Sequence, residues 1–243
     1  MGMCEQVRTA VILAAGNGVR LTTSSGLPKP LVPIAGKPLL GHVLSRLELS
    51  GIQEVFVVVG YRGQEIRSQF CNNWGDVSIQ WLENPHFELG NGRSLLAAAG
   101  HVVSDFLLLM ADHIFESDTL EKLLQQPLPT EGGVLAVDDE PSRVFDLPDA
   151  TKVQRQSGRV MAIGKELPEY DAVDTGMFLL TPAIFRAMRN GTRTGPHSLS
   201  QGVGRFTREN RVDAWSIEGR HWIDVDTPEA LEEARRLCST SVF

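Results

Sequence analysis

A glycine-containing segment that ends in an arginine, Gly16-Asn17-Gly18-Val19-Arg20, follows a short apolar run near the start of the chain. Glycines let backbone N–H groups approach phosphate oxygens, and a guanidinium can bind a phosphate through two hydrogen bonds. The segment is not the dinucleotide fingerprint, because Leu21 stands where the third glycine would be, and no Gly-Lys-Ser/Thr follows as in a P-loop. From these residues alone, phosphate binding and an ordinary strand-to-helix turn are equally supported.

A lysine enclosed by two prolines, Pro28-Lys29-Pro30, comes next. Proline fixes the backbone and so reduces the entropy lost when the lysine side chain is aimed at a ligand. A single lysine is usually a solvated surface residue. Its enclosure so soon after the glycine segment makes Lys29 a candidate for a second positive charge beside a bound anion.

Carboxylates follow two other apolar stretches. Asp112 comes directly after the run from Phe106 to Met110, where an aspartate can hold Mg²⁺ beside a phosphate or simply cap a turn. Asp224 and Asp226 precede a predicted helix, and we expect only one of them to face the site, because side chains alternate along an extended segment. Two acidic clusters and a cationic loop together favour metal-assisted chemistry on a nucleoside triphosphate.

The other candidate nucleophiles and bases form no recognisable constellation. The six histidines show neither a triad nor a metal-ligand spacing, although His113, next to Asp112, could line the same pocket or be purely structural. The sequence contains no Gly-x-Ser-x-Gly elbow, so a serine hydrolase has little support.

The elements that must position these residues alternate in type over the first half of the chain. Short apolar runs predict buried strands, and helical spacing predicts helices between them. Such alternation is typical of a doubly wound α/β sheet, whose ligands bind outside the carboxyl ends of the strands. The loop 14–20, residues 60–61 and Asp112 all follow strands there. The predicted strands are 9–13, 54–59, 78–82 and 105–110, and the predicted helices are 38–50, 64–72, 94–103 and 117–125.

After Pro127 the pattern changes to short strands separated by turns, and we expect a β-rich half that packs on the same sheet. A polar loop is expected at 189–197, and a final helix at 229–237 with Thr227 as N-cap and Pro228 as its first residue. The chain is therefore interpreted as a single domain, 1–243, with halves of about 1–126 and 127–243. The strands predicted in the second half are 133–137, 151–153, 159–163 and 177–180.

Composition excludes several classes of protein. The 243 residues carry a net charge of −7, which argues against a broad basic face for nucleic acid. No apolar run approaches the ~18 residues of a membrane span, and Glu5 and Arg8 interrupt any signal peptide. Three widely spaced cysteines predict neither a disulfide framework nor a zinc site, and favour a cytoplasmic location. The sequence leaves open whether the chain forms a homo-oligomer.

The segment from Leu13 to Arg20, followed by Pro28-Lys29-Pro30-Leu31, resembles the signature of nucleotidyltransferases that join a nucleoside triphosphate to a phosphorylated acceptor. The resemblance continues along nearly the whole chain, where it is closest to the cytidylyltransferase part of CTP:inositol-1-phosphate cytidylyltransferases. That part is fused to a membrane-embedded phosphotransferase in some organisms. Since nothing follows Phe243, we expect the soluble enzyme alone. The further matching segments are 91–95, 110–113, 149–153, 163–165, 173–176 and 222–227.

This resemblance implies a Rossmann-like mixed sheet of the nucleotidyltransferase (GT-A-like) type, with CTP and a small phosphorylated alcohol, inositol-1-phosphate, as substrates and Mg²⁺ as cofactor. Ala111 departs from the glycine that many relatives carry before the metal-binding aspartate. The resemblance implies that the nucleotide is held by Leu13, Ala14, Ala15, Gly16, Asn17, Gly18 and Arg20, its α-phosphate by Lys29, and its base and ribose by Asn91 and Ser94. It further implies that Asp112 and Asp226 bind the metal, with Asp224 less favoured, that Lys165 and Lys152 bind the acceptor phosphate, and that Asp174 and Thr175 line the acceptor pocket.

Two other kinds of protein stay open. The same enzyme class could use a sugar-1-phosphate with UTP or dTTP, or phosphocholine or a phosphonate with CTP. A catalytically silent, nucleotide-binding regulatory subunit would bind nucleotide without releasing pyrophosphate. A glycosyltransferase is disfavoured by Pro28-Lys29-Pro30, because such an enzyme binds an already formed nucleotide sugar.

Overall fold

The computed structural model describes residues 6–21, 26–189, 198–240 and 243. The strands are β1 Thr9–Ala14, β2 Pro33–Ile34, β3 Lys37–Pro38, β4 Glu54–Val59, β5 Asn73–Trp74, β6 Val77–Glu83, β7 Phe106–Met110, β8 His113–Phe115, β9 Gly133–Asp138, β10 Lys152–Gln156, β11 Arg159–Gly164, β12 Ala172–Leu180, β13 Val212–Ser216 and β14 Trp222–Asp224. The helices are α1 Leu39–Leu49, α2 Gly63–Gln69, α3 Asn91–Ala97, α4 Thr119–Leu124, α5 Ala183–Arg189, α6 Leu199–Glu209 and α7 Pro228–Ser239, with 3₁₀ turns at Lys29–Leu31, Phe87–Leu89 and Pro141–Arg143.

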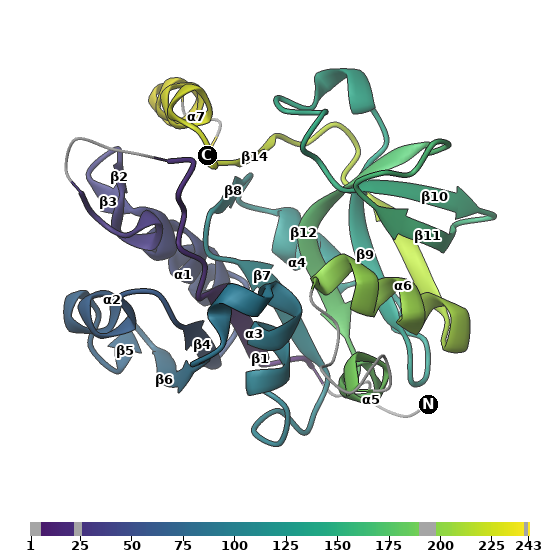
Figure 1. Cartoon of the computed structure of the whole chain (residues 1–243), viewed down its shortest axis with the longest axis horizontal. Helices are drawn as coiled ribbons and strands as arrows, with labels where there is room; N and C mark the ends of the chain where they lie inside the picture. The colour runs from purple at the N-terminus through teal and green to yellow at the C-terminus, as the bar shows by residue number, and fades with distance from the viewer. Residues whose placement is uncertain (1–5, 22–25, 190–197, 241–242) are drawn as a thin grey trace.

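One mixed sheet of ten strands runs through both halves of the chain, in the order β10-β11-β13-β9-β12-β7-β1-β4-β6-β5 (Figure 1). β7, β1, β4 and β6 are parallel, so their carboxyl ends meet at one edge. β12 is antiparallel to both β7 and β9 and joins the second half to the first. The expectation that the β-rich half extends the same sheet is therefore confirmed.

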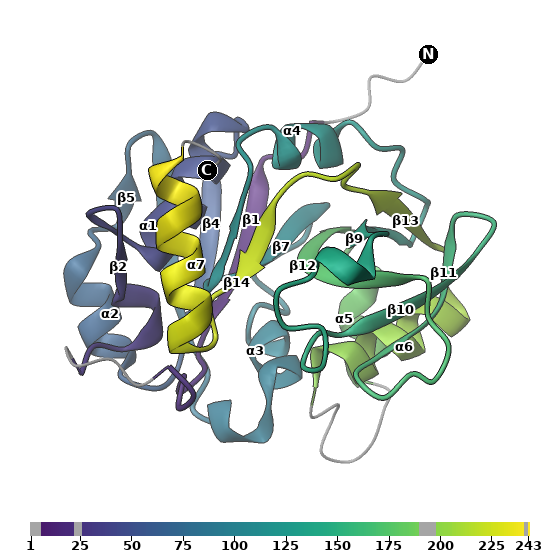
Figure 2. The ribbon, with the colours of Figure 1, turned by 90° about the horizontal axis from the view of Figure 1, so that it is seen from above.

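Helices cover both faces of this sheet, because its central strands are apolar on both sides. Ile12 and Val57 belong to the core beneath α1 and α4, whereas Val11 and Phe56 belong to the core beneath α3, α5 and α6. Figure 2 shows α4 on one side of the sheet and α3, α5 and α6 on the other. Burial of each such side chain contributes about 1.5–3 kcal/mol, and the result is a rigid support for the loops at the carboxyl edge.

The last helix has the predicted start. Thr227 is its N-cap and accepts a hydrogen bond from the Ala230 amide at 3.2 Å, and Pro228 is its first residue. α7 packs against β2 and β14, and its Leu231 lies in a third apolar cluster with Ile114. This packing fixes the segment that carries Asp224 and Asp226 beside the end of β7.

Several predicted boundaries were wrong. α3 begins three residues before Ser94 and ends at Ala97, because Gly100, at φ +97°, turns the chain out of the helix. The helix predicted over 64–72 ends at Gln69. α5, α6 and β13 were not predicted, and of the expected polar loop Arg189 ends α5, while 190–197 lie outside the described residues.

Two further observations concern the chain as a whole. Among the described residues, no helix combines the length and the apolar character needed to cross a membrane. Cys71 and Cys238 carry free thiols, and Cys4 lies outside the described part.

Candidate active site

Two adjoining cavities open at the carboxyl edge of the parallel strands. The smaller, of about 210 Å³, is formed by the loop after β1 together with Lys29 and Ala111. The larger, of about 330 Å³, lies towards the second half and includes Asn91, Lys165 and Asp174. Arg20, Asp112 and Asp226 line both cavities, so these three residues mark the place where the contents of the two cavities would meet.

The loop after β1 lines the smaller cavity as predicted for a nucleotide-binding segment. Gly18 has a φ of +56°, and a Cβ at this position would lie 2.8 Å from the Cβ of Lys29, so a side chain is not tolerated there. Ala15 is buried, and its carbonyl accepts a hydrogen bond from the Tyr61 amide at 3.1 Å. The other predicted residues of this segment, Leu13, Ala14, Gly16, Asn17 and Gly18, line the cavity.

Lys29 and three carboxylates form the core of a cluster that we call the buried centre: Lys29, Asp112, His113, Asp224 and Asp226. The ammonium of Lys29 lies 2.7 Å from Asp112 and 3.5 Å from Asp224, and it also contacts Asp226. The expectation that only one of Asp224 and Asp226 faces the site was therefore wrong. Residues two apart in an extended segment share a side, and the intervening Val225 is the one that points into the core.

The pKa values of the buried centre follow from opposing effects of burial and charge. Burial opposes ionisation of Lys29 and Asp112, but their mutual attraction outweighs it, so the pKa of Lys29 is raised and that of Asp112 is lowered. Burial raises the pKa of Asp224 to about 6, with the nearby Asp112 carboxylate acting in the same direction. The centre thus combines permanent charges with one carboxyl that titrates near neutral pH.

The same cluster has the donor set of a divalent cation site. One potential ligand atom from each of Asp112, His113 and Asp224 lies within 4.8 Å of the others. Asp224 Oδ1 is buried and has no hydrogen-bond partner in the part of the chain that the structure describes. Its pairing with the Lys29 ammonium, at 3.5 Å, includes no hydrogen bond, and a buried carboxylate oxygen of this kind fits a divalent metal ion.

His113 is a member of the buried centre that sequence reasoning left undecided. Its Nδ1 lies 2.8 Å from Asp112 Oδ1, and its ring stacks on Trp222 with ring centroids 5.8 Å apart. Burial lowers its pKa, but Asp224 and Asp112 raise it to about 9 overall. The position of His113 next to Asp112 is the sequence signal that could have placed it in the buried centre.

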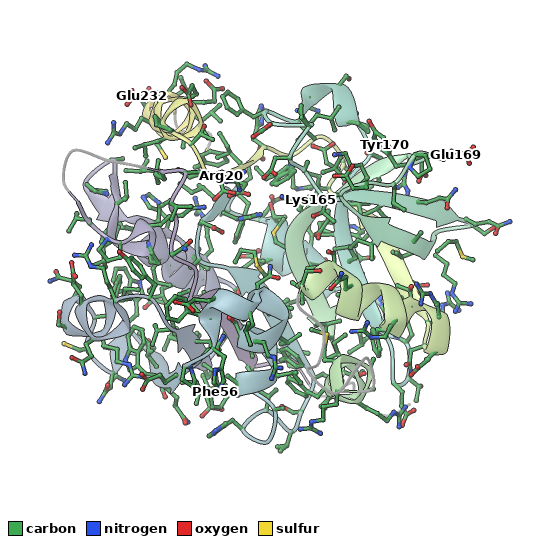
Figure 3. The ribbon with its side chains drawn as sticks, viewed as in Figure 1. Arg20, Phe56, Lys165, Glu169, Tyr170 and Glu232 are labelled. Carbon is green, nitrogen blue, oxygen red and sulfur yellow. The ribbon has the colours of Figure 1, made fainter. Side chains whose placement is uncertain are left out.

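A second ion cluster, which we call the outer chain, consists of Arg20, Asp149 and Lys165. Asp149 accepts from Arg20 and from Lys165, each at 2.6 Å, and Arg20 also contacts Asp226. Figure 3 labels Arg20 and Lys165, which come from the two halves of the chain. Burial of Asp149 opposes its charge, but the hydrogen bonds from the two cations lower its pKa. Asp149 was not among the predicted site residues, although it is the first residue of the matching segment 149–153.

The remaining predicted residues divide into two groups. Asn91 and Asp174 line the larger cavity, where burial raises the pKa of Asp174 to about 6. Three others do not line either cavity: Lys152 donates to the Pro148 carbonyl at 2.9 Å, Ser94 accepts from Asn84 at 3.1 Å, and Thr175 donates to the Ala136 carbonyl at 2.8 Å. These three side chains therefore form hydrogen bonds to neighbouring residues and do not face either cavity.

A mixed α/β sheet with a glycine loop, a lysine and converging carboxylates at its carboxyl edge defines a nucleotide-dependent enzyme. Residues 10–199 match the MobA-like NTP transferase domain, and the chain belongs to this family of nucleotidyltransferases. The chain resembles the inositol-1-phosphate CTP transferase from T. maritima, with a TM-score of 0.87 and 25% identity over 96% of each chain. The fold class and the enzyme class predicted from the sequence are confirmed.

Two curated relatives illustrate the range of the family. The Bifunctional IPC transferase and DIPP synthase of Thermococcus kodakarensis is 37% identical over 94% of this chain and 50% of the relative. The UTP--glucose-1-phosphate uridylyltransferase AglF of Haloferax volcanii is 29% identical over 93% of this chain and 95% of the relative. The chain thus spans about half the length of the first of these relatives.

Proposed function

We propose that this chain transfers a cytidylyl group from CTP to inositol-1-phosphate and releases pyrophosphate, with Mg²⁺ as cofactor. The observation that carries the proposal is the pair of cavities that share Arg20, Asp112 and Asp226. One cavity has the glycine loop expected of a triphosphate site, and the other has a lysine and buried polar groups suited to a phosphorylated polyol. The relatives named for IPC transfer and inositol-1-phosphate CTP transfer support the choice of substrates.

In the proposed reaction an oxygen of the acceptor phosphate attacks the α-phosphorus of CTP, and pyrophosphate leaves. The attacking oxygen is anionic at pH 7, so no protein base is needed, and the main task is to bring anions together. Arg20 lies between the cavities and can contact both substrates, Lys29 faces the junction, and Lys165 faces the acceptor cavity. Asp112 with Asp224 or Asp226 would hold Mg²⁺, which would supply neutralisation of the phosphate charge in the transition state.

The acceptor and the base are the least constrained parts of this proposal. The similarity to a UTP-dependent glucose-1-phosphate enzyme keeps a sugar-1-phosphate as the second candidate. Asn91 lines the larger cavity, and its Oδ1 accepts a hydrogen bond from the Leu199 amide at 2.8 Å. Its amide nitrogen is the group we assign to contact with the base or ribose.

Pyrophosphate release in Mg²⁺ tests the proposal. CTP, UTP, dTTP, ATP and GTP are each combined with inositol-1-phosphate, phosphocholine, glucose-1-phosphate and 2-aminoethylphosphonate. We expect release with CTP and inositol-1-phosphate, and its loss in Asp112→Ala. Release with another pair would refute the assigned acceptor or nucleotide but keep the enzyme class. Nucleotide binding without release from any pair would favour a silent regulatory subunit.

The sheet that continues through both halves supports a single domain. The cytoplasmic location and the oligomeric state remain predictions from the sequence. Size-exclusion chromatography with light scattering measures the oligomeric state directly.

A further inference from the structure

His113 is fixed on three sides, which is more than packing of a wall residue requires. Its Nδ1 is 2.8 Å from Asp112 Oδ1, and because a carboxylate carries no proton, Nδ1 is the donor. One ring face stacks on Trp222 at an interplanar angle of 23°. On another side lies Gly176, at φ +74°, where an added Cβ would be 2.7 Å from His113 Cδ2. Only glycine leaves room for the imidazole in this orientation.

Trp222 is itself held by a buried acceptor. Its Nε1 donates to Asp138 Oδ2 at 3.0 Å, and Asp138 Oδ1 accepts from the Glu140 amide at 2.9 Å. Asp138 is 5% exposed and lies at the end of β9 in the second half of the chain. The orientation of the indole, and through it that of the imidazole, is thus set by a satisfied hydrogen-bond network.

The backbone places His113 directly between two carboxylates. Asp112 precedes it, and Asp224 is its partner across the antiparallel pair β8 and β14. Nδ1 lies 3.7 Å from Asp224 Oδ1, so one N–H group faces both like charges. Together with the Lys29 ammonium, which lies 2.7 Å from Asp112 and 3.5 Å from Asp224, this donor offsets the repulsion between the two carboxylates.

The hydrogen bond also determines which oxygens stay available. It occupies Asp112 Oδ1, while Asp112 Oδ2 accepts from Lys29 at 2.7 Å and Asp224 Oδ1 accepts no hydrogen bond from the described residues. A nitrogen engaged as a donor to a carboxylate does not serve as a metal ligand. Partners that orient metal-binding carboxylates in this way typically change metal affinity by 10–100-fold.

We propose that His113 is a positioning residue: its Nδ1–H holds the Asp112 and Asp224 carboxylates in the arrangement that binds the divalent cation, and Trp222 and Asp138 hold the imidazole in place. This inference rests on the metal-dependent part of the proposed function. It assigns His113 Nδ1 as a hydrogen-bond donor to the carboxylates and not as a metal ligand.

Binding of Mn²⁺, followed by electron paramagnetic resonance without nucleotide, tests this assignment in the whole chain of 243 residues. We expect His113→Ala to weaken Mn²⁺ affinity by 10–100-fold. His113→Asn should stay within about threefold of the wild type, because the amide retains an N–H near the position of Nδ1 but is a poor metal ligand. His221→Ala is the matched control, since His221 also pairs with a carboxylate, Glu116, at 2.8 Å but lies outside both cavities.

Kinetics and thermal melting separate positioning from general support. His113→Ala should lower kcat with little change in KM for the acceptor and little loss of Tm, and Trp222→Phe should give a smaller change of the same kind. Loss of Mn²⁺ binding in His113→Asn as large as in His113→Ala would overturn the donor role in favour of a ligand. Wild-type affinity in His113→Ala, or no Mn²⁺ binding by the wild type, would overturn the inference.

If the Mn²⁺ results hold but no pyrophosphate is released, only the proposed function fails.

Discussion

The buried centre and the outer chain are built from the same kinds of residue but differ in their exposure to water. The Lys29–Asp112 and Lys165–Asp149 pairs have nearly equal lengths, 2.7 and 2.6 Å. The difference lies in the lysines, whose side chains are 6% exposed at Lys29 and 48% exposed at Lys165, because the side chains of Asp112 and Asp149 are similarly exposed, at 28% and 33%. Charges that are out of water interact strongly and are costly to unpair, whereas exposed pairs are screened and contribute little.

This difference separates two tasks of an enzyme that brings anions together. The buried centre keeps its charges in place whether or not substrate is bound, as electrostatic catalysis requires. In the outer chain one carboxylate bridges Arg20 and Lys165 much as a phosphate would. Because the exposed pairs are weak, an incoming phosphate can replace Asp149. Variants of the buried centre should therefore change the stability of the fold and the rate of the chemical step. Variants of the outer chain should change the affinity for the acceptor.

Lys29→Met should have the largest effect. It leaves Asp112, Asp224 and Asp226 close together without the central ammonium, and breaking a buried ion cluster typically costs about 3–5 kcal/mol. We expect the free energy of unfolding in urea to fall by about this amount, and Mg²⁺ to restore part of it. Lys37→Met, which removes a lysine bonded to Ser45, is the matched control. Equal stability of the two variants would mean that the buried centre is held by packing alone.

Asp112→Ala should abolish most of the activity while preserving the fold. Asp112 lines both cavities and pairs with both Lys29 and His113. Removal of one electrostatic stabiliser of a transition state lowers kcat by about 10²–10³-fold. The rate of pyrophosphate release at saturating substrates and Mg²⁺ measures the effect. A rate near that of the wild type in saturating Mg²⁺ would contradict the metal assignment.

The sequence predicted the buried centre better than the outer chain, for a physical reason. Lys29 and Asp112 follow strands whose apolar runs are readable, so the topology of a parallel sheet brings them to one edge. Asp149 is joined to Arg20 and Lys165 by contacts between segments that are apart in the sequence, which no apolar periodicity encodes, and the one local signal for His113 was its position next to Asp112. The error over Asp224 and Asp226 came from misapplying strand alternation, and α5 and α6 were missed because their short apolar faces are interrupted by polar residues and, in α6, by Gly202 and Gly204.

Asp174→Asn tests how burial alone, rather than pairing with a bridging lysine, affects the ionisation of a carboxyl group. Burial raises the pKa of Asp174 to about 6 from an ordinary value of 3.8, so the folded state holds a proton that the unfolded state has lost. Stability is therefore lost as pH rises from about 4 through 6, by about 2–3 kcal/mol at neutral pH. The asparagine variant should lack this loss and be more stable than the wild type at pH 7 but not at pH 4. Parallel pH profiles of urea unfolding for the two proteins would contradict the shifted pKa.

Lys165→Ala should act mainly on acceptor affinity. Lys165 lines the larger cavity and is half-exposed, so its loss removes one charge-assisted contact to the acceptor phosphate and little packing. We expect KM for the acceptor to rise by about tenfold or more, with KM for CTP nearly unchanged. Lys122→Ala, an exposed lysine on α4 paired with Asp118, is the control. An increase in KM for CTP alone would place Lys165 at the nucleotide instead.

Asp149→Asn should have the smallest effect on KM for the acceptor, and the direction of this change distinguishes two roles of Asp149. If Asp149 occupies the cations that the acceptor phosphate needs, its neutralisation should lower KM for the acceptor, by up to about fivefold, since an exposed ion pair contributes at most about 1 kcal/mol. The effect should shrink as salt screens the exposed charges, and the free energy of unfolding should change by less than about 1 kcal/mol. Initial rates at about 20 and about 300 mM salt measure this dependence, because the Debye length is longer than about 10 Å at the first concentration and shorter at the second. A rise in KM would instead mean that Asp149 orients Arg20 and Lys165 for the acceptor, and the outer chain would then resemble the buried centre in its role.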